Sequence, residues 1–172
     1  MTEANVGEAI MAHARERLQN DYLPKLMDCL NRLSEEETWW RPHPTSNSVG
    51  NLLLHLSGNL RQWIVHGLGC EPNHRVRQQE FDERGPMAKA ELARKLESTL
   101  DEVYQVLERF DRRLLLEPRT IQGYETNALF AVIHVVEHFA QHLGQILYIT
   151  KMLKAVDLRH FVFDEHGYRI RE

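Results

Sequence analysis

Three histidines recur at intervals of four residues in the last third of the chain, at His134, His138 and His142. Each residue of an α-helix turns the chain by about 100°, so a step of four advances the side-chain direction by only about 40°. Neighbouring histidines of this set therefore lie on one helix face, and two imidazoles one turn apart can bind the same metal ion. All three together span about 80°, so the outer two need not share a site.

The apolar residues of the same segment indicate which histidines point into the protein. His138 and His142 lie at the edge of the apolar stripe, whereas His134 is directed toward Glu137 and Gln141, on the side expected to face solvent. The sequence favours His138 and His142 as the inward-facing pair, with His134 and His138 as the alternative pair. The stripe itself consists of Val136, Phe139, Leu143, Ile146 and Leu147.

A further histidine, His55, stands within the apolar run Leu52–Leu56. A buried imidazole is costly unless both ring nitrogens are satisfied, and a lone one is most often a core residue that hydrogen-bonds a nearby carbonyl. Asn59 and Gln62 share its side of the expected helix and make a polar strip. Together with an inward-facing pair on another helix, His55 would complete a set of three imidazoles. Such a set leaves at least one position open on Zn²⁺ or Ni²⁺, as in catalytic sites.

The composition narrows the classes of partner. Lysine and arginine total 21 against 25 aspartates and glutamates in 172 residues, a net charge of −4. Nucleic-acid binding requires a basic face, so we expect no nucleic-acid partner. No apolar stretch reaches the roughly 20 residues needed to span a bilayer, and Met1–Ile10 has no secretory pattern. Cys29 and Cys70 are too few for a disulfide framework and are expected to be buried. We therefore expect a cytoplasmic protein without membrane contact.

Helical periodicity in four segments supplies the elements that must position the histidines. Pro24 is expected to kink the first segment, Ser34 and Glu37 have the spacing of a capping box, and Ser48 is a good N-cap for the second. The stretch 70–86 is long and polar, which is typical of a functional flap or a mobile loop. We predict a single all-α domain over residues 1–172, a four-helix bundle with a short C-terminal tail. The helices are expected over about 5–33, 48–68, 89–112 and 126–153. A polar turn at 123–126 precedes the fourth helix, and the tail covers 157–172.

Three stretches in this order resemble the DinB superfamily, in particular the DinB/YfiT-like metal-dependent enzymes. They are Trp40-Arg41-Pro42, then Ser48-Val49-Gly50-Asn51 leading to His55, and then His138-x-x-x-His142 followed by Leu-Gly-Gln-Ile. The resemblance covers about residues 5–154. It implies an up-down-down-up four-helix bundle that often dimerises, and a metal ion held by His55, His138 and His142. The residue arithmetic selects the same three histidines.

The resemblance also implies a class of chemistry. The superfamily includes thiol S-transferases that use low-molecular-weight thiols, and the metal would lower the pKa of a bound thiol or water. We therefore expect a metal-dependent thiol S-transferase or hydrolase acting on a small molecule, with Zn or Ni as the metal, and a homodimer. His43 and Trp40 would lie at the pocket mouth or simply on the surface. No catalytic acid or base is identified. The alternatives are a non-enzymatic metal- or ligand-binding bundle, and a structural bundle whose histidines only pack.

Overall fold

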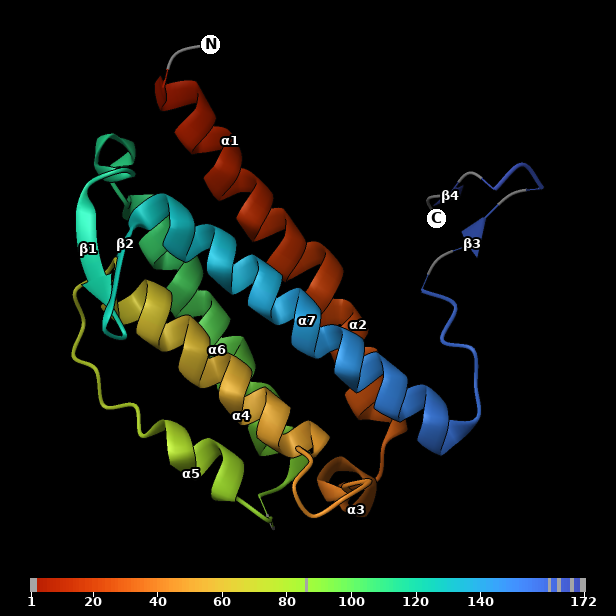
Figure 1. The fold of residues 1–172 in the computed structure, drawn as a ribbon. Coiled ribbons are helices and arrows are strands. Elements are labelled where there is room, and N and C mark those ends of the chain that lie inside the picture. Colours follow the sequence, from red (N-terminus) through yellow and green to blue (C-terminus); the bar gives the residue numbers. More distant parts are fainter. Residues whose placement is uncertain (1–2, 86, 161, 164, 168, 171–172) are drawn as a thin grey trace.

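The computed structural model describes every residue except 1–2, 86, 161, 164, 168 and 171–172. Its helices make four long passages that pack side by side, as expected for a DinB-like bundle (Figure 1). Two of these passages contain a π-helical turn. In chain order the passages are α1 (Glu3–Glu16), η1 (Arg17–Tyr22) and α2 (Leu23–Arg32); α4 (Val49–Leu60) and η2 (Arg61–His66); α6 (Lys89–Arg109); and α7 (Ala128–Lys154).

The passages follow the up-down-down-up order. The first and fourth run in one direction and the second and third in the opposite one (Figure 1). A glutamate near the end of the first passage, Glu35, accepts a hydrogen bond from the backbone N–H of Lys89 (2.8 Å), at the start of α6. Arg112, just beyond the other end of α6, donates to Glu8 near the start of the chain (3.0 Å). Because α4 and α6 run parallel, the stretch between them must travel back along the whole bundle.

The core is built from the helical stripes that the sequence predicts. Leu92, Leu96, Leu100, Val103 and Leu107 of α6 are all buried. On α7, Phe139, Leu143 and Ile146 are buried too, and the Phe139 ring stacks on Tyr22 with 5.8 Å between ring centroids. Burial of these side chains supplies most of the driving force for assembling a bundle of amphipathic helices.

The first passage is interrupted by a wider turn just before Pro24. The backbone N–H of Leu23 donates to the Leu18 carbonyl, five residues back, so the hydrogen-bond register has shifted by one. Pro24 therefore falls in the first turn of α2, where its missing donor costs little. The expected irregularity thus takes the form of the π-helical turn η1.

Several short elements lie outside the four passages. The capping box at Ser34 and Glu37 is present and begins α3 (Glu35–Trp39). The polar stretch 70–86, expected to be a flap or loop, contains a helix, α5 (Arg77–Asp82). In the tail, β3 (Val162–Phe163) pairs with β4 (Arg169–Ile170). Phe161, which precedes β3 in this tail, lies outside the described residues.

The polar turn expected at 123–126 belongs to a β-hairpin, which the sequence analysis missed. The strands β1 (Pro118–Ile121) and β2 (Tyr124–Asn127) pair antiparallel from Pro118↔Asn127 to Ile121↔Tyr124. Gln122 and Gly123, both at positive φ, form the two-residue turn. Strands this short are marginal alone, so tertiary contacts must hold them. Ile121 is buried against Gly67, where a Cβ would lie only 2.7 Å from its side chain.

Asn51 fixes the stretch 70–86 to the bundle. Its Oδ1 accepts from the backbone N–H of Ser48 (3.1 Å), which caps α4, and its Nδ2 donates to the carbonyls of Glu80 (2.8 Å) and Glu83 (3.0 Å). The Arg41 guanidinium also donates to the Glu83 carbonyl (2.8 Å). Arg41 and Asn51, which belong to the DinB-like stretches, therefore both help to dock α5 on α4.

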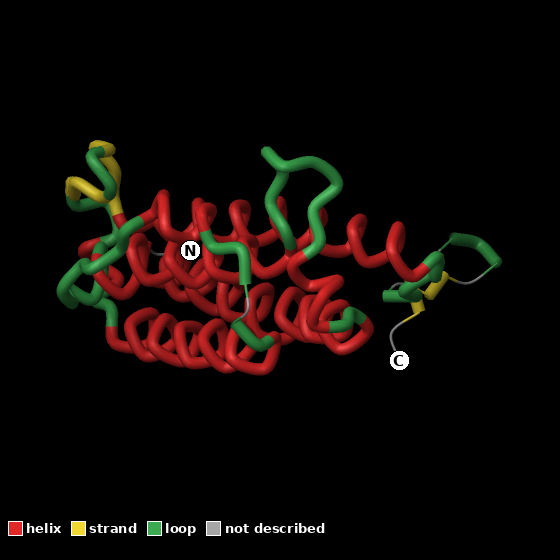
Figure 2. The backbone as a smooth tube through the Cα atoms, turned by 90° about the horizontal axis from the view of Figure 1, so that it is seen from below, coloured by secondary structure: helices red, strands yellow, loops and turns green. Residues whose placement is uncertain are grey.

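The hairpin and the tail strands lie at opposite ends of the bundle (Figure 2). The tail is attached by His160, whose Nε2 lies 2.9 Å from Asp28 Oδ2. Among the described residues, no helix has the length and hydropathy needed to cross a membrane.

We expect Asn51→Ala to lower the free energy of unfolding by about 1–3 kcal/mol, because it leaves buried donors and acceptors unpaired. Urea unfolding followed by circular dichroism measures this loss. Limited proteolysis should at the same time cut the stretch 77–83 faster than in the parent. A variant with parental stability and parental cleavage in this stretch would contradict the role given to Asn51.

Candidate metal centre

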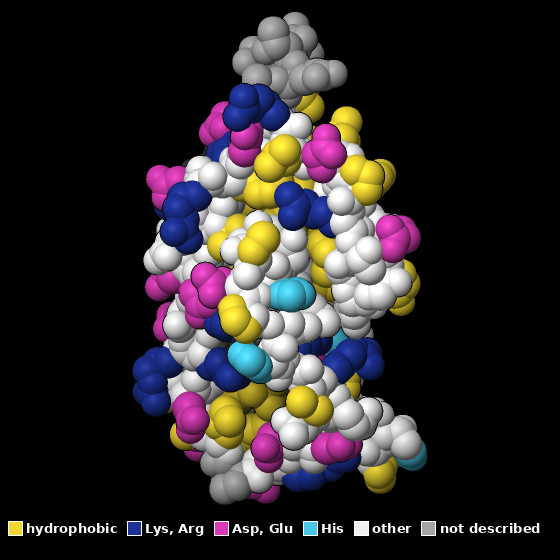
Figure 3. Space-filling model, turned by 90° about the vertical axis from the view of Figure 1, so that its left-hand side faces the viewer, with side chains coloured by type: hydrophobic (Ala, Val, Ile, Leu, Met, Phe, Trp, Pro, Cys, Tyr) yellow, Lys and Arg dark blue, Asp and Glu magenta, His cyan; other side chains and the backbone are white. Residues whose placement is uncertain are grey.

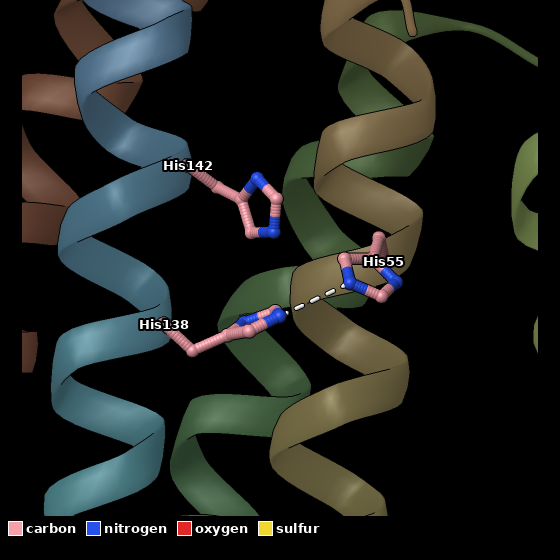
Figure 4. A group of neighbouring side chains, drawn as sticks. All are labelled: His55, His138 and His142. Atoms are coloured by element: carbon pink, nitrogen blue, oxygen red, sulfur yellow. Dashed lines mark hydrogen bonds between the residues drawn. The ribbon is translucent and has the colours of Figure 1, made fainter.

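Three histidines from two helices converge between α4 and α7 (Figure 4). His55 comes from α4, and His138 and His142 come from α7, one turn apart as the sequence predicts. A nitrogen of each lies within 4.8 Å of the others, a grouping that could hold a metal ion. His55 Nε2 and His138 Nε2 are 3.1 Å apart. We call this set the histidine triad.

The donor set and spacing suit a divalent transition metal. Tetrahedral zinc with Zn–N bonds of about 2.0–2.1 Å would separate two ligand nitrogens by roughly 3.3 Å, close to the His55–His138 distance. The buried Nδ1 of His138 has no hydrogen-bond partner among the described residues. Imidazole nitrogens suit Zn, Ni, Cu and Fe, so the triad alone does not select one metal.

Hydrogen bonds at Nδ1 turn the Nε2 atoms of two triad members toward the centre. The Nδ1 of His55 lies 2.8 Å from Glu80 Oε2, and the Nδ1 of His142 lies 2.8 Å from Gln145 Oε1. An oxygen acceptor at Nδ1 keeps the proton there, which leaves the lone pair on Nε2. Metal-binding histidines are characteristically oriented in this way.

Glu80 is itself held by Arg75. The Arg75 guanidinium donates to both carboxylate oxygens, Nε to Oε1 (2.6 Å) and Nη2 to Oε2 (2.8 Å), and Nη1 donates to Gln62 (2.7 Å). Burial raises the pKa of Glu80, but the hydrogen bonds from Arg75 and His55 outweigh this effect and lower the pKa below its usual value. Glu80 therefore carries a negative charge behind His55 at neutral pH.

Gly58 makes room for this ion pair on the surface of α4. A Cβ at Gly58 would lie 2.0 Å from Glu80 Oε1 and 2.8 Å from Arg75 Nε. The pair therefore packs directly against the helix backbone, one turn beyond His55. Any side chain larger than hydrogen at this position must displace the Glu80 carboxylate.

The triad histidines on α7 are poor bases in the metal-free protein. Burial, helped by the neighbouring histidines and Arg75, lowers the pKa of His138 to about 3. Burial also lowers the pKa of His142, against the hydrogen bond that its Nδ1–H donates to Gln145, which raises it. Both rings are therefore neutral at pH 7, as a metal ligand must be.

His134 is not on the solvent side, as the sequence analysis expected. Its ring packs on Trp63 with 3.9 Å between centroids, and its Nε2 lies 3.1 Å from Asn59 Nδ2. Burial lowers its pKa. The prediction was wrong because the hairpin and η2 cover this side of α7. His134 faces a cavity of about 380 Å³, here called the hairpin cavity, whose inner end is formed by His55 and His138.

Two further histidines lie outside the hairpin cavity. His43, expected at the pocket mouth or on the surface, bonds Thr45 on an exposed loop, and His66 at the end of η2 bonds the Glu71 carbonyl. Cys29 is buried as expected, but Cys70 is exposed, because it lies in the turn after η2. On the face drawn in Figure 3, acidic and basic side chains are interspersed rather than gathered by sign.

Sequence reasoning missed Glu80 and Arg75. Both belong to the stretch 70–86, for which the sequence predicted only a flap or a mobile loop. The available signal was Gly58 one turn after His55, an unfavourable residue inside a helix unless something must approach the backbone closely. That signal identifies the helix face but not the partner.

Known proteins share this architecture. Over residues 5–165 the sequence matches the family described as Protein of unknown function (DUF1572). The chain is similar to a DinB-like protein from Bacillus cereus ATCC 10987, with a TM-score of 0.64 and 16% identity, over 80% of this chain and 91% of that one. It is also similar to a conserved protein from Enterococcus faecalis, with a TM-score of 0.63 and 14% identity, over 91% and 99% of the two chains. At these identities the likeness concerns the fold alone. No curated protein matches the chain.

The depressed pKa of His138 predicts how acid affects the metal-free protein. Its folded pKa of about 3 lies below the value of about 6.5 expected in the unfolded chain, so the unfolded state takes up the proton first as pH falls. The contribution of neutral His138 to the free energy of unfolding is therefore present above about pH 6.5 and is lost progressively as the pH falls toward 3. Urea unfolding in the presence of a chelator should show that the free energy of unfolding declines from pH 7 to pH 4.

His138→Gln should reduce that decline, whereas His13→Gln, at an exposed position of α1, should leave it unchanged. Equal pH slopes for the parent and His138→Gln would contradict the assignment.

Proposed function

Since the chain belongs to the DUF1572 family of DinB-like proteins, we propose that it is a metal-dependent enzyme that acts on a small molecule, as a thiol S-transferase or hydrolase. The observation that carries this proposal is the histidine triad with an ionised glutamate behind one member. A closed structural site would use a fourth protein ligand, whereas three imidazoles leave a position for substrate.

His55, His138 and His142 would hold the metal, with Zn or Ni as the expected ion. When bound, such an ion acts as a Lewis acid. It would lower the pKa of a thiol or water and so provide a nucleophile at neutral pH. The expected cofactor set is therefore the divalent metal together with a low-molecular-weight thiol, or water in the hydrolase case.

The protein's own residues would keep this centre in place. Glu80 accepts the Nδ1 proton of His55 and fixes the ring's direction, and Arg75 keeps Glu80 ionised in a buried position. The carboxylate also increases the basicity of the imidazole toward a metal. The hairpin cavity reaches the triad at its inner end and offers a partly enclosed space for the substrate.

Removing any triad imidazole should abolish stoichiometric metal binding. We expect His55→Ala, His138→Ala and His142→Ala each to weaken Zn²⁺ or Ni²⁺ binding by more than about 100-fold, the upper end of what an outer-shell change costs. Competition with a chromophoric chelator measures this, and His43→Ala, on an exposed loop, is the control. A parent protein that binds neither metal stoichiometrically would refute the proposal.

Turnover assays with the metal-loaded protein then test the enzymatic part. Low-molecular-weight thiols offered with electrophiles such as epoxides, and ester or amide substrates without a thiol, separate transferase from hydrolase activity. Metal binding without turnover in either assay would favour the non-enzymatic metal- or ligand-binding bundle.

The ion pair behind His55 makes a separate prediction. Glu80→Gln should weaken metal binding by about 10- to 100-fold, because the outer-shell carboxylate is lost. Gly58→Ala should do the same without altering any charged residue, since its Cβ displaces Glu80. Gly144→Ala is the matched control, because a Cβ there meets nothing within 4 Å on α7. Equal metal affinity in Gly58→Ala and Gly144→Ala would contradict this role for Glu80.

The cytoplasmic location and the homodimer stay predictions. The exposed large apolar residues of α7 support the second, because such residues are candidates for burial against another copy. They are Phe130, Ile133, Tyr148 and Met152.

A further inference from the structure

The hairpin cavity extends from the triad to the two-residue turn of the β-hairpin. Its inner end is formed by His55 and His138, and its outer end by Tyr124 and Gln122 of the hairpin and Trp63 of η2. At about 380 Å³ it falls in the lower range of small-molecule pockets. A ligand in it would touch the triad at one end and the hairpin at the other.

The outer end is aromatic. The rings of Trp63 and Tyr124 are nearly parallel, with 6.3 Å between centroids and 27° between planes. Trp63 is buried and is also covered by His134. Tyr124, in contrast, is 63% exposed although it lines the cavity. A ring that is left in water beside a cavity favours a ligand that covers it with a flat apolar surface.

The charged side chains that line the cavity already have partners within the protein. The Arg77 guanidinium lies over the Phe81 ring (4.8 Å to the centroid), Glu125 accepts a hydrogen bond from Thr120 (2.8 Å), and Arg75 is paired with Glu80. The remaining polar groups there are neutral: Trp63 Nε1 donates to Gln122 Oε1 (3.0 Å), and Asn59 bonds His134. An ionic ligand group would have to compete with these partners for Arg77 or Glu125, whereas a neutral one would lose little on desolvation.

We propose that the hairpin cavity binds the uncharged aromatic end of the substrate, while the substrate's reacting end lies at the triad. The substrate class is therefore a small aromatic compound with a metal-binding or electrophilic group a few bonds from the ring. This inference rests on the proposed function, because it takes the triad as the metal centre. It adds Tyr124 and Trp63 as residues that determine specificity.

Two zinc-binding probes that differ only at the far end test the proposal. Benzohydroxamate and acetohydroxamate share the chelating group, and only the first carries a ring. Calorimetric titration of the zinc-loaded full-length protein should show about tenfold tighter binding of benzohydroxamate, as stacking and apolar burial predict. Equal affinities for the two probes would overturn the proposal.

Variants at Tyr124 locate the preference. Tyr124→Ala should reduce the ratio of the two affinities to about twofold or less while leaving zinc and acetohydroxamate binding unchanged. Tyr124→Phe should keep the ratio, because the ring remains. Leu116→Ala is the control, since Leu116 is a similarly exposed apolar residue (66%) outside the cavity. A ratio that is unchanged in Tyr124→Ala, or that falls equally in Leu116→Ala, would overturn the assignment.

The metal centre and the aromatic subsite can be refuted separately. A protein that does not bind zinc in the chelator competition overturns the proposed function and this inference with it. A protein that binds zinc and both hydroxamates with equal strength keeps its metal centre and loses only the aromatic subsite.

Discussion

A histidine within the buried face of α4 imposes a requirement that much of the structure meets. His55 is 5% exposed, and each ring nitrogen of a buried imidazole needs a partner. Its Nε2 lies beside His138 Nε2, and its Nδ1 is hydrogen-bonded to Glu80. The buried charge of Glu80 in turn requires Arg75. Burying the His55 ring thus requires two further buried groups, the Glu80 carboxylate and the Arg75 guanidinium. Each group is stable in its buried position only because the next is present.

The parallel arrangement of α4 and α6 is what makes that chain of partners available. Parallel neighbours need a long return connection, and the stretch 70–86 runs back over α4 past His55. Asn51 and Arg41 dock this stretch through its backbone carbonyls, and Gly58 lets its side chains reach the helix surface. The connection that parallel helices require thereby supplies Glu80 and Arg75, the residues that lie behind His55. The hairpin between α6 and α7 has a comparable place at the other side of the triad, where it lines the cavity.

Periodicity was sufficient for the features that depend on one helix. The spacing of His138 and His142 predicted a shared face, the apolar stripe predicted that this face is inward, and the fold class followed from four such helices. The same reasoning failed for His134, because its environment depends on Trp63 and on a hairpin of two four-residue strands. Strands this short have no periodic signal of their own, and contacts such as Ile121 on Gly67 hold them in place.

The sequence by itself determined the helices of the four-helix bundle, the shared face of His138 and His142, the place of His55 within an apolar run, and the imidazole chemistry that such residues offer. Local geometry decides these features, since a helix repeats every 3.6 residues whatever surrounds it. Only the tertiary structure decided that Glu80 and Arg75 stand behind His55 and that His134 faces a cavity lined by Tyr124. These contacts join segments 20 to 75 residues apart, such as His55 with Arg75 and Asn59 with His134. No periodic pattern records which segments meet at such separations, because packing and docked carbonyls select them.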